Sequence, residues 1–144
     1  FHDTADITVI KMTASNEGEN ITEAYIQAVR SAAHDMSVTI MLGRLMCDMG
    51  WYEKSQQYFL KLMAAPHGED LAWIKHNIGR ALDNKGEWKT ALKYYNNAYE
   101  QMMSVNPPRI KDSAYVLTSI GCVFRKEGRF RKALRSFRSC NDLQ

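Results

Sequence analysis

Residues 77–98 read NIGRALDNKGEWKTALKYYNNA and predict two helices joined by a tight turn. Gly86 ends the first helix, because glycine readily takes the left-handed conformation that satisfies the last carbonyl groups of a helix. Gly79 lies inside this helix, where glycine costs about 1 kcal/mol relative to alanine. That cost is explained if the missing side chain lets a second helix approach closely. The second helix begins near Glu87 and places on one face the residues Ala91, Tyr95 and Ala98.

The same order of residue types occurs three times in the chain. From Gly79, a glycine follows after seven residues, an aromatic residue after nine, a small residue after twelve, an aromatic after sixteen and a small or apolar residue after nineteen. The same offsets from Gly43 and from Gly121 give Gly50, Tyr52, Ser55, Phe59 and Leu62, and Gly128, Phe130, Ala133, Phe137 and Cys140. A repeat of this length predicts stacked helix pairs. The expected fold is therefore all-α, a short solenoid of about three pairs.

These offsets resemble the tetratricopeptide repeat (TPR), and the resemblance covers about residues 36–144. It implies a right-handed superhelix with a concave ligand face, built from helix pairs at about 36–66, 71–106 and 112–144. The marker glycines Gly43, Gly79 and Gly121 are 36 and then 42 residues apart. The longer spacing, together with the HNIG motif at 76–79, resembles the repeats of kinesin light chains. Thr39, Lys75 and Leu117 replace an aromatic residue that is common in the family.

Residues 1–35 do not follow the repeat. The β-branched run ITVIKMT at 7–13 predicts a short strand, and Asn20 with Glu23 predicts the start of a capping helix at about 21–33. This front end, followed by LGRLMCDMGWYEKSQQYF at 42–59, resembles proteins in which an arginine-specific ADP-ribosyltransferase domain precedes a TPR array. That resemblance implies a regulatory or targeting arm of a larger enzyme. Because the chain begins at Phe1, we expect an excised or processed fragment.

Composition narrows the function classes. The 144 residues are 45% hydrophobic, which is enough for one continuous core, and no run of eighteen apolar residues predicts a membrane span. The three cysteines are widely spaced and odd in number, which favours a reducing, cytoplasmic setting. No histidine or cysteine spacing is typical of a metal site. We expect no enzymatic activity, no metal and no cofactor, and we expect Asp70 to cap the helix that follows it.

Residues 121–144 hold seven basic and two acidic residues, a net charge of +5. On a helix, Arg131, Arg135 and Arg138 share a face opposite the expected core positions, so a solvated surface or an acidic protein partner is favoured over nucleic acid. No further helix is expected after the third pair, which would leave Ile120, Phe124 or Phe137 partly uncovered. We therefore expect self-association through residues 7–13 or through the last repeat.

The residues beside the packing positions on the first helix of each pair are expected to line a concave binding surface. They are Met41 and Arg44 in the first repeat, His76, Asn77, Arg80 and Asn84 in the second, and Ser119 and Arg125 in the third. Asn77 stands where kinesin light chains place a groove asparagine, and its amide can both donate to and accept from a peptide backbone. Arg44 and Arg80 add donors suited to carboxylates. The sequence thus predicts a non-catalytic protein-protein interaction module for an extended, possibly acidic peptide.

Overall fold

The structure, a computed structural model, describes residues 37–64 and 70–143. The strand expected at 7–13 and the capping helix expected at 21–33 lie outside these residues. The described part contains α3 (Val38–Asp48), α4 (Tyr52–Ala64), α5 (Leu71–Asn84), α6 (Trp88–Ser104), α7 (Ile110–Lys126) and α8 (Phe130–Leu143). No strand is present within it, and the all-α prediction is confirmed there.

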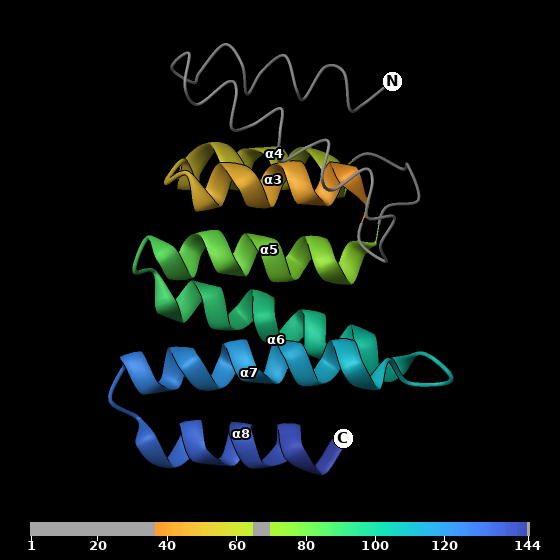
Figure 1. The fold of residues 1–144 in the computed structure, drawn as a ribbon, viewed down its shortest axis with the longest axis vertical. Helices are drawn as coiled ribbons and strands as arrows, with labels where there is room; N and C mark the ends of the chain where they lie inside the picture. The colour runs from red at the N-terminus through yellow and green to blue at the C-terminus, as the bar shows by residue number, and fades with distance from the viewer. Residues whose placement is uncertain (1–36, 65–69, 144) are drawn as a thin grey trace.

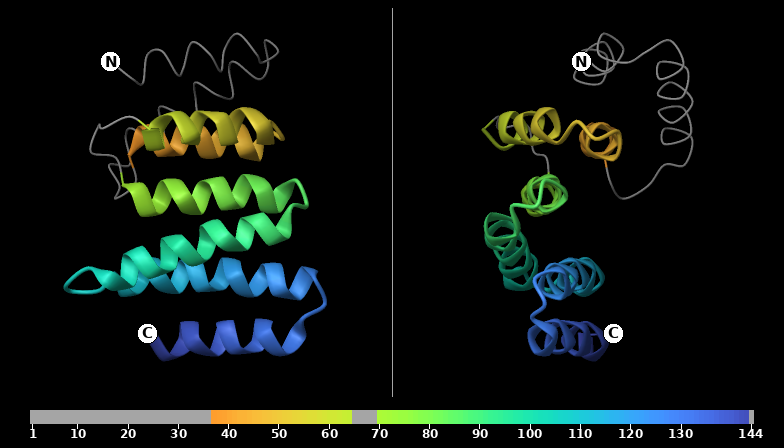
Figure 2. Two further views of the ribbon diagram at one scale, coloured as in Figure 1. Left: turned by 180° about the vertical axis from the view of Figure 1, so that it is seen from behind. Right: turned by 90° about the vertical axis from the view of Figure 1, so that its left-hand side faces the viewer.

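The helices stack in chain order as three antiparallel pairs, α3 with α4, α5 with α6 and α7 with α8 (Figure 1). The second helix of each pair also packs against the first helix of the next, so α4 contacts α5 and α6 contacts α7. The right-hand view of Figure 2 looks roughly along the helix axes, which are nearly parallel or antiparallel to one another along the stack. This arrangement is the solenoid that the repeated glycine and aromatic positions predict.

Each helix pair turns at a glycine with positive φ. Gly50, Gly86 and Gly128 have φ of 85°, 86° and 77°. At the turn after α5, the N–H of Glu87 donates to the carbonyl of Leu82 at 2.9 Å, and the N–H of Gly86 donates to that of Asp83 at 2.9 Å. These two bonds satisfy carbonyls that the end of the helix leaves free, as the sequence predicts for Gly86.

The marker glycine of each pair faces the aromatic ring that follows sixteen residues later. A Cβ atom added at Gly79 would lie 2.7 Å from the ring of Tyr95, and one added at Gly121 would lie 2.5 Å from the ring of Phe137. Gly43 meets Phe59 in the same way. No side chain fits in these positions, so the repeated glycines are required for the close approach of the paired helices.

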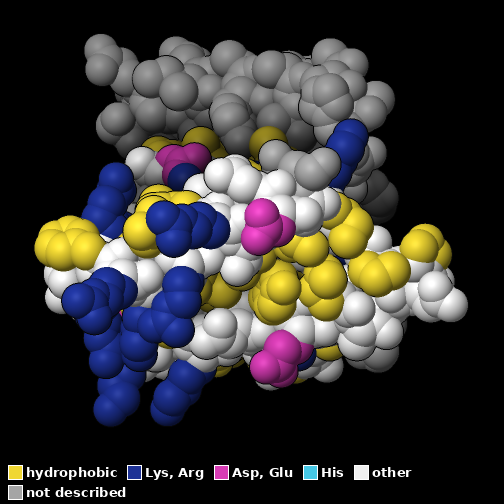
Figure 3. Space-filling model, turned by 90° about the horizontal axis from the view of Figure 1, so that it is seen from below, with side chains coloured by type: hydrophobic (Ala, Val, Ile, Leu, Met, Phe, Trp, Pro, Cys, Tyr) yellow, Lys and Arg dark blue, Asp and Glu magenta, His cyan; other side chains and the backbone are white. Residues whose placement is uncertain are grey.

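Leu42, Leu45 and Met46 on α3 form a small separate cluster, whereas the main core runs through the stack from Ile40 to Val123. Its largest fully buried side chains include Phe59, Ile74, Ile78, Tyr95 and Met102. Ile120, Phe124 or Phe137 was expected to be partly uncovered at the end of the stack; Phe124 and Phe137 are half-buried, and Ile120 is buried. At that end hydrophobic side chains lie beside a concentration of lysine and arginine side chains (Figure 3).

None of the described helices combines the length and the apolar character needed to cross a membrane.

Candidate functional site

A depression lies between the first helices of the second and third pairs, and we call it the α5–α7 groove. Its volume is about 240 Å³. Its lining residues come mostly from α5 and α7: His76, Arg80, Asp83, Asn84, Tyr95, Tyr115, Thr118, Ser119 and Cys122. The lining combines two aromatic rings with hydroxyl, amide and charged groups, so it can offer both hydrogen bonds and apolar contact.

His76 forms the floor of the groove. Its ring is buried, and its Nε2 atom lies 2.9 Å from the hydroxyl oxygen of Ser119. Burial, reinforced by the positive charges of Arg44 and Arg80, lowers the pKa of His76 to about 3. The imidazole is therefore neutral near pH 7 and contributes hydrogen bonding without charge. Both arginines therefore act on this ring through their charge, and Asp83 places a carboxylate in the same lining.

Arg80 connects the groove to the preceding repeat. Its Nη2 atom donates to Oδ1 of Asp48 at 2.6 Å, which joins α5 to the end of α3. Burial alone would lower the pKa of Arg80, but Asp48 more than reverses this effect, so the pKa lies above its ordinary value. The Nη1 atom of Arg80 is buried and has no hydrogen-bond partner. The guanidinium group thus keeps donor capacity that the folded chain does not use.

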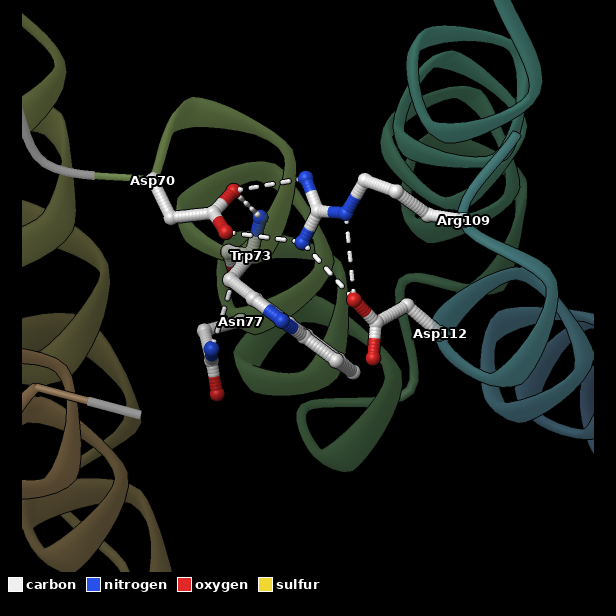
Figure 4. A network of polar contacts seen from close by, with 5 residues as sticks. All are labelled: Asp70, Trp73, Asn77, Arg109 and Asp112. Carbon is white, nitrogen blue, oxygen red and sulfur yellow. Dashed lines mark hydrogen bonds and ion pairs between the residues drawn. The ribbon is translucent and has the colours of Figure 1, made fainter. Parts of the chain in front are cut away.

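Asn77 lies on the neighbouring face of α5 and is 2% exposed. Its Nδ2 atom donates to the carbonyl oxygen of Trp73, one turn earlier, at 2.8 Å (Figure 4). Its Oδ1 atom is buried and accepts no hydrogen bond. A buried amide oxygen without a partner is uncommon in folded proteins, because leaving it unpaired costs about 1–3 kcal/mol.

An ion-pair network ties the start of α5 to the start of α7. Asp70 caps α5, because its Oδ1 atom accepts from the N–H of Trp73 at 3.3 Å, as predicted from the sequence. Arg109 donates to both oxygens of Asp70, at 3.1 and 2.7 Å, and also to Asp112 (Figure 4). The two pairs are thereby fixed to each other at one end of the groove.

Aromatic side chains extend the groove toward this network. The exposed ring of Tyr115 packs edge-on against Trp73 and His76, with ring centroids 5.6 and 5.3 Å away. Since Tyr115 is 48% exposed, it offers a flat apolar surface beside the neutral imidazole.

The structure brings together half of the residues expected at the binding surface. His76, Arg80, Asn84 and Ser119 line the α5–α7 groove. Arg44 acts on the same ring of His76 through its charge, although it is not among the lining residues. Asn77 is buried rather than open to solvent. Met41 is half-buried on α3, and Arg125 is exposed near the end of α7, and neither lines the groove.

Several groove residues were not anticipated from the sequence. Asp83 accepts from Lys126 at 2.8 Å and from the Tyr95 hydroxyl at 3.3 Å, so it links the second pair to the third. Tyr115, Thr118 and Cys122 complete the opposite wall on α7. A sequence signal was available for this wall, because Tyr115, Thr118 and Cys122 are spaced by three and four residues and so share one face of α7.

Within residues 37–64 and 70–143, no group of three or more His, Cys, Asp or Glu side chains is placed to hold a metal ion.

No protein-family model and no curated protein matches the chain. Among solved structures, that of a point mutant of MamA, a TPR-containing protein, is similar with a TM-score of 0.57 and 21% sequence identity. The match covers 98% of this chain and 93% of that chain. At this level of identity the likeness concerns the fold, and it supports a TPR-like arrangement of the helix pairs.

Proposed function

We propose that the chain is a non-catalytic protein-interaction module that holds an extended, carboxylate-bearing peptide along the α5–α7 groove. A fold of this kind does not specify a ligand, so the argument depends on the groove itself. One observation carries it: Asn77 Oδ1 and Arg80 Nη1, from residues three apart on α5, are both buried polar atoms without partners. A ligand that completes their hydrogen bonds recovers a cost that the free chain bears.

The charge of the groove favours a carboxylate. A guanidinium group has five N–H donors in a planar fork, and Arg80 uses its Nη2 atom on Asp48 while Nη1 has no partner. Arg44 adds positive charge to the same region, as its effect on His76 indicates. Since His76 is neutral, it does not add a third positive charge and can accept or donate a hydrogen bond.

The size of the groove favours a peptide segment over a whole small molecule. Sites that enclose a drug-sized ligand have volumes of roughly 300–1,000 Å³, and this groove has about 240 Å³. It has room for one or two side chains, with the rest of an extended peptide lying along the helices. Asn77 is the proposed backbone contact, in keeping with the resemblance of HNIG at 76–79 to the kinesin light-chain motif. Its Oδ1 would accept a peptide N–H once neighbouring side chains move aside.

The test uses fluorescein-labelled twelve-residue peptides of three kinds, acidic, neutral and basic, with binding followed by anisotropy. We expect the wild-type chain to prefer the acidic peptides. Asn77→Ala and the double variant Arg44→Gln/Arg80→Gln should each weaken that binding at least tenfold. Lys89→Gln/Lys111→Gln, which removes the same charge from exposed positions on α6 and α7, serves as the matched control and should change binding less than twofold.

Two results would contradict this proposal. One is equal binding of all three peptide classes by the wild-type chain. The other is unchanged affinity in both groove variants while circular dichroism shows that they remain folded.

The alternative role, a targeting arm of an ADP-ribosyltransferase-like enzyme, is supported only by the sequence resemblance of the front end, and residues 1–36 lie outside the described part. A cytoplasmic setting is supported by Cys47, Cys122 and Cys140, which are all free thiols. Self-association through residues 7–13 or through the last repeat stays a prediction of the sequence.

A further inference from the structure

A further pocket is formed by α4, α5 and α6, and we call it the α4–α6 pocket. Its volume is about 240 Å³, and its described lining residues are Met63 on α4, Lys75 on α5, and Lys93, Tyr94 and Asn97 on α6. In the right-hand view of Figure 2, α4 and α6 lie on the same side of the stack, and α5 packs against both of them. None of these residues lines the α5–α7 groove, so the pocket is separate from the site proposed above.

Lys75 places a cation at a repeat position that is neutral in the other two pairs. It stands four residues before the marker glycine of the second pair, and the equivalent residues of the first and third pairs are Thr39 and Leu117. Both of these are buried, and Lys75 is half-buried. Withdrawing an ammonium group from water costs free energy unless the charge is paired or hydrogen-bonded. The surroundings of Lys75 therefore show what compensates this charge.

The ammonium group of Lys75 is bound by neutral acceptors. Its Nζ atom donates to Oδ1 of Asn97 at 2.7 Å and to Oε1 of Gln101 at 3.0 Å, both on α6. These bonds use two of its three donors, so one N–H remains for a ligand. Neither Lys75 nor Lys93 forms an ion pair with a carboxylate in the part of the chain that the structure describes. The described lining thus contains two cations and no aspartate or glutamate.

Tyr94 adds a hydroxyl group to the pocket. Its equivalent in the first pair, Tyr58, donates to the carbonyl oxygen of Thr39 at 2.7 Å. Thr39 is the equivalent of Lys75, so the second pair has a tyrosine at the same junction without that bond. The Tyr94 hydroxyl makes no hydrogen bond to any described residue, and the ring is half-buried against the core. The hydroxyl is therefore a third donor available to a ligand in the pocket.

These groups suit a carboxylate joined to a small apolar body. Two ammonium groups and a hydroxyl can donate to the two oxygens of a carboxylate, and they supply no competing negative charge. The thioether of Met63 and the ring of Tyr94 offer apolar contact suited to a flat hydrocarbon group. A phosphate is commonly bound by arginine forks or by N–H groups at the start of a helix, and the described lining offers neither.

We propose that the α4–α6 pocket binds a carboxylate that carries a small apolar group. The carboxylate pairs with Lys75 and Lys93 and accepts from the Tyr94 hydroxyl, while the apolar group lies against Met63. A free aryl acid and the C-terminal residue of a peptide both offer this chemistry, and the test below separates them. The proposal concerns different residues from the α5–α7 groove, and it does not depend on the peptide proposed there.

The test follows the methionine methyl signals of the chain by NMR, with the signal of Met63 assigned from its loss in Met63→Leu. The small probes are phenylacetate, its uncharged analogue phenylacetamide, and phenyl phosphate. The peptide probes are an acetylated tripeptide ending in phenylalanine, as the free acid and as the C-terminal amide. We expect each free acid to shift the Met63 signal and to bind at least tenfold more tightly than its amide. The tighter binder of phenylacetate and the free-acid tripeptide identifies the source of the carboxylate.

Variants of the full chain then locate the bound carboxylate. Lys75→Met keeps the length of the side chain without its charge, and Lys93→Glu reverses a charge at an exposed position, so the fold should persist. Each should weaken binding of phenylacetate at least tenfold. Tyr94→Phe removes only the hydroxyl and should weaken binding by roughly two- to tenfold, the range for one hydrogen bond. Arg131→Glu applies a reversal of charge at an exposed position on α8 and should leave the affinity unchanged.

Three results would overturn the proposal. The first is a Met63 signal that neither free acid shifts. The second is an affinity for phenylacetamide or phenyl phosphate that equals or exceeds the affinity for phenylacetate. The third is binding of phenylacetate that survives both lysine variants while circular dichroism shows them to be folded. Arg80→Gln, which alters the α5–α7 groove, should leave phenylacetate binding unchanged, so the two proposals can fail separately.

Discussion

Arg109, at the start of α7, donates two hydrogen bonds to Asp70, the residue that caps α5 thirty-nine positions earlier, at 3.1 and 2.7 Å. Asp70 therefore stabilises the chain twice, once as the cap of its own helix and once as the anchor for the next helix pair. Arg109 also bonds Asp112 on its own helix, and this second contact is local. The long-range pair links the starts of the second and third repeats.

Because Asp70 has two roles and Asp112 has one, replacing Asp70 should lower the stability of the fold more than replacing Asp112. Asp70→Ala should lower the free energy of unfolding by about 1–2 kcal/mol, because a helix cap is worth about 0.5–2 kcal/mol and a partly exposed ion pair adds at most about 1 kcal/mol. Asp112→Ala should cost less than about 1 kcal/mol. Urea unfolding monitored by circular dichroism measures both. Equal losses would show that the cap and the long-range pair contribute little.

The close contact between Gly79 and Tyr95 predicts that a larger residue at position 79 destabilises the fold. Helix propensity alone predicts the opposite effect. Gly79→Leu should lower the free energy of unfolding by about 1–3 kcal/mol, because the new side chain would overlap a ring that is 1% exposed. Asn96→Leu, at an exposed position of α6, is the control for helix propensity and should change stability little. A higher melting temperature for Gly79→Leu would disprove the close-approach argument.

The pairwise fold could be predicted from the sequence because its determinants are local. Gly86 and its turn lie within one helix pair, and Gly79 meets a ring only sixteen residues away. The repetition of these short-range relationships is visible in the sequence without knowledge of how successive pairs are oriented.

The binding surface could be predicted only in part, because its geometry depends on contacts between pairs. His76, Arg80 and Asn84 share a face of one helix, so helical spacing was sufficient to group them. The burial of Asn77, the bond from Arg80 to Asp48 and the link from Arg109 to Asp70 all depend on the angle between neighbouring pairs. Spacing within a repeat carries no information on that angle, which is why Arg125 was assigned to a groove that it does not line.

We expect Asn77 to contribute to peptide binding but little to the stability of the fold. Asn77→Leu introduces a side chain of similar volume and removes both the hydrogen bond to Trp73 and the unpaired oxygen. Replacing a poorly satisfied buried polar group by an apolar one of similar shape can leave the stability of the fold nearly unchanged. We expect a melting temperature within about 2 °C of wild type, or a small increase, as ~0.5 kcal/mol corresponds to a shift of this order. Peptide binding in the groove should be lost. A loss of stability above about 2 kcal/mol would instead assign Asn77 a structural role.

His76 is expected to make the folded chain sensitive to acid. Its pKa is about 3 in the folded chain and about 6.5 in an unfolded chain, so between these values the unfolded state binds more protons. Stability is therefore fully retained above about pH 6.5 and is lost as the pH falls toward 3, by up to about 1.4 kcal/mol for each pH unit from this residue. His76→Gln keeps a side chain that can bond Ser119 but cannot be protonated in this range. Urea unfolding at pH 7, 6, 5 and 4 should give a smaller loss of stability for the variant than for wild type. Parallel curves for the two proteins would show that His76 is protonated in the folded chain without cost, and that the groove is open to water.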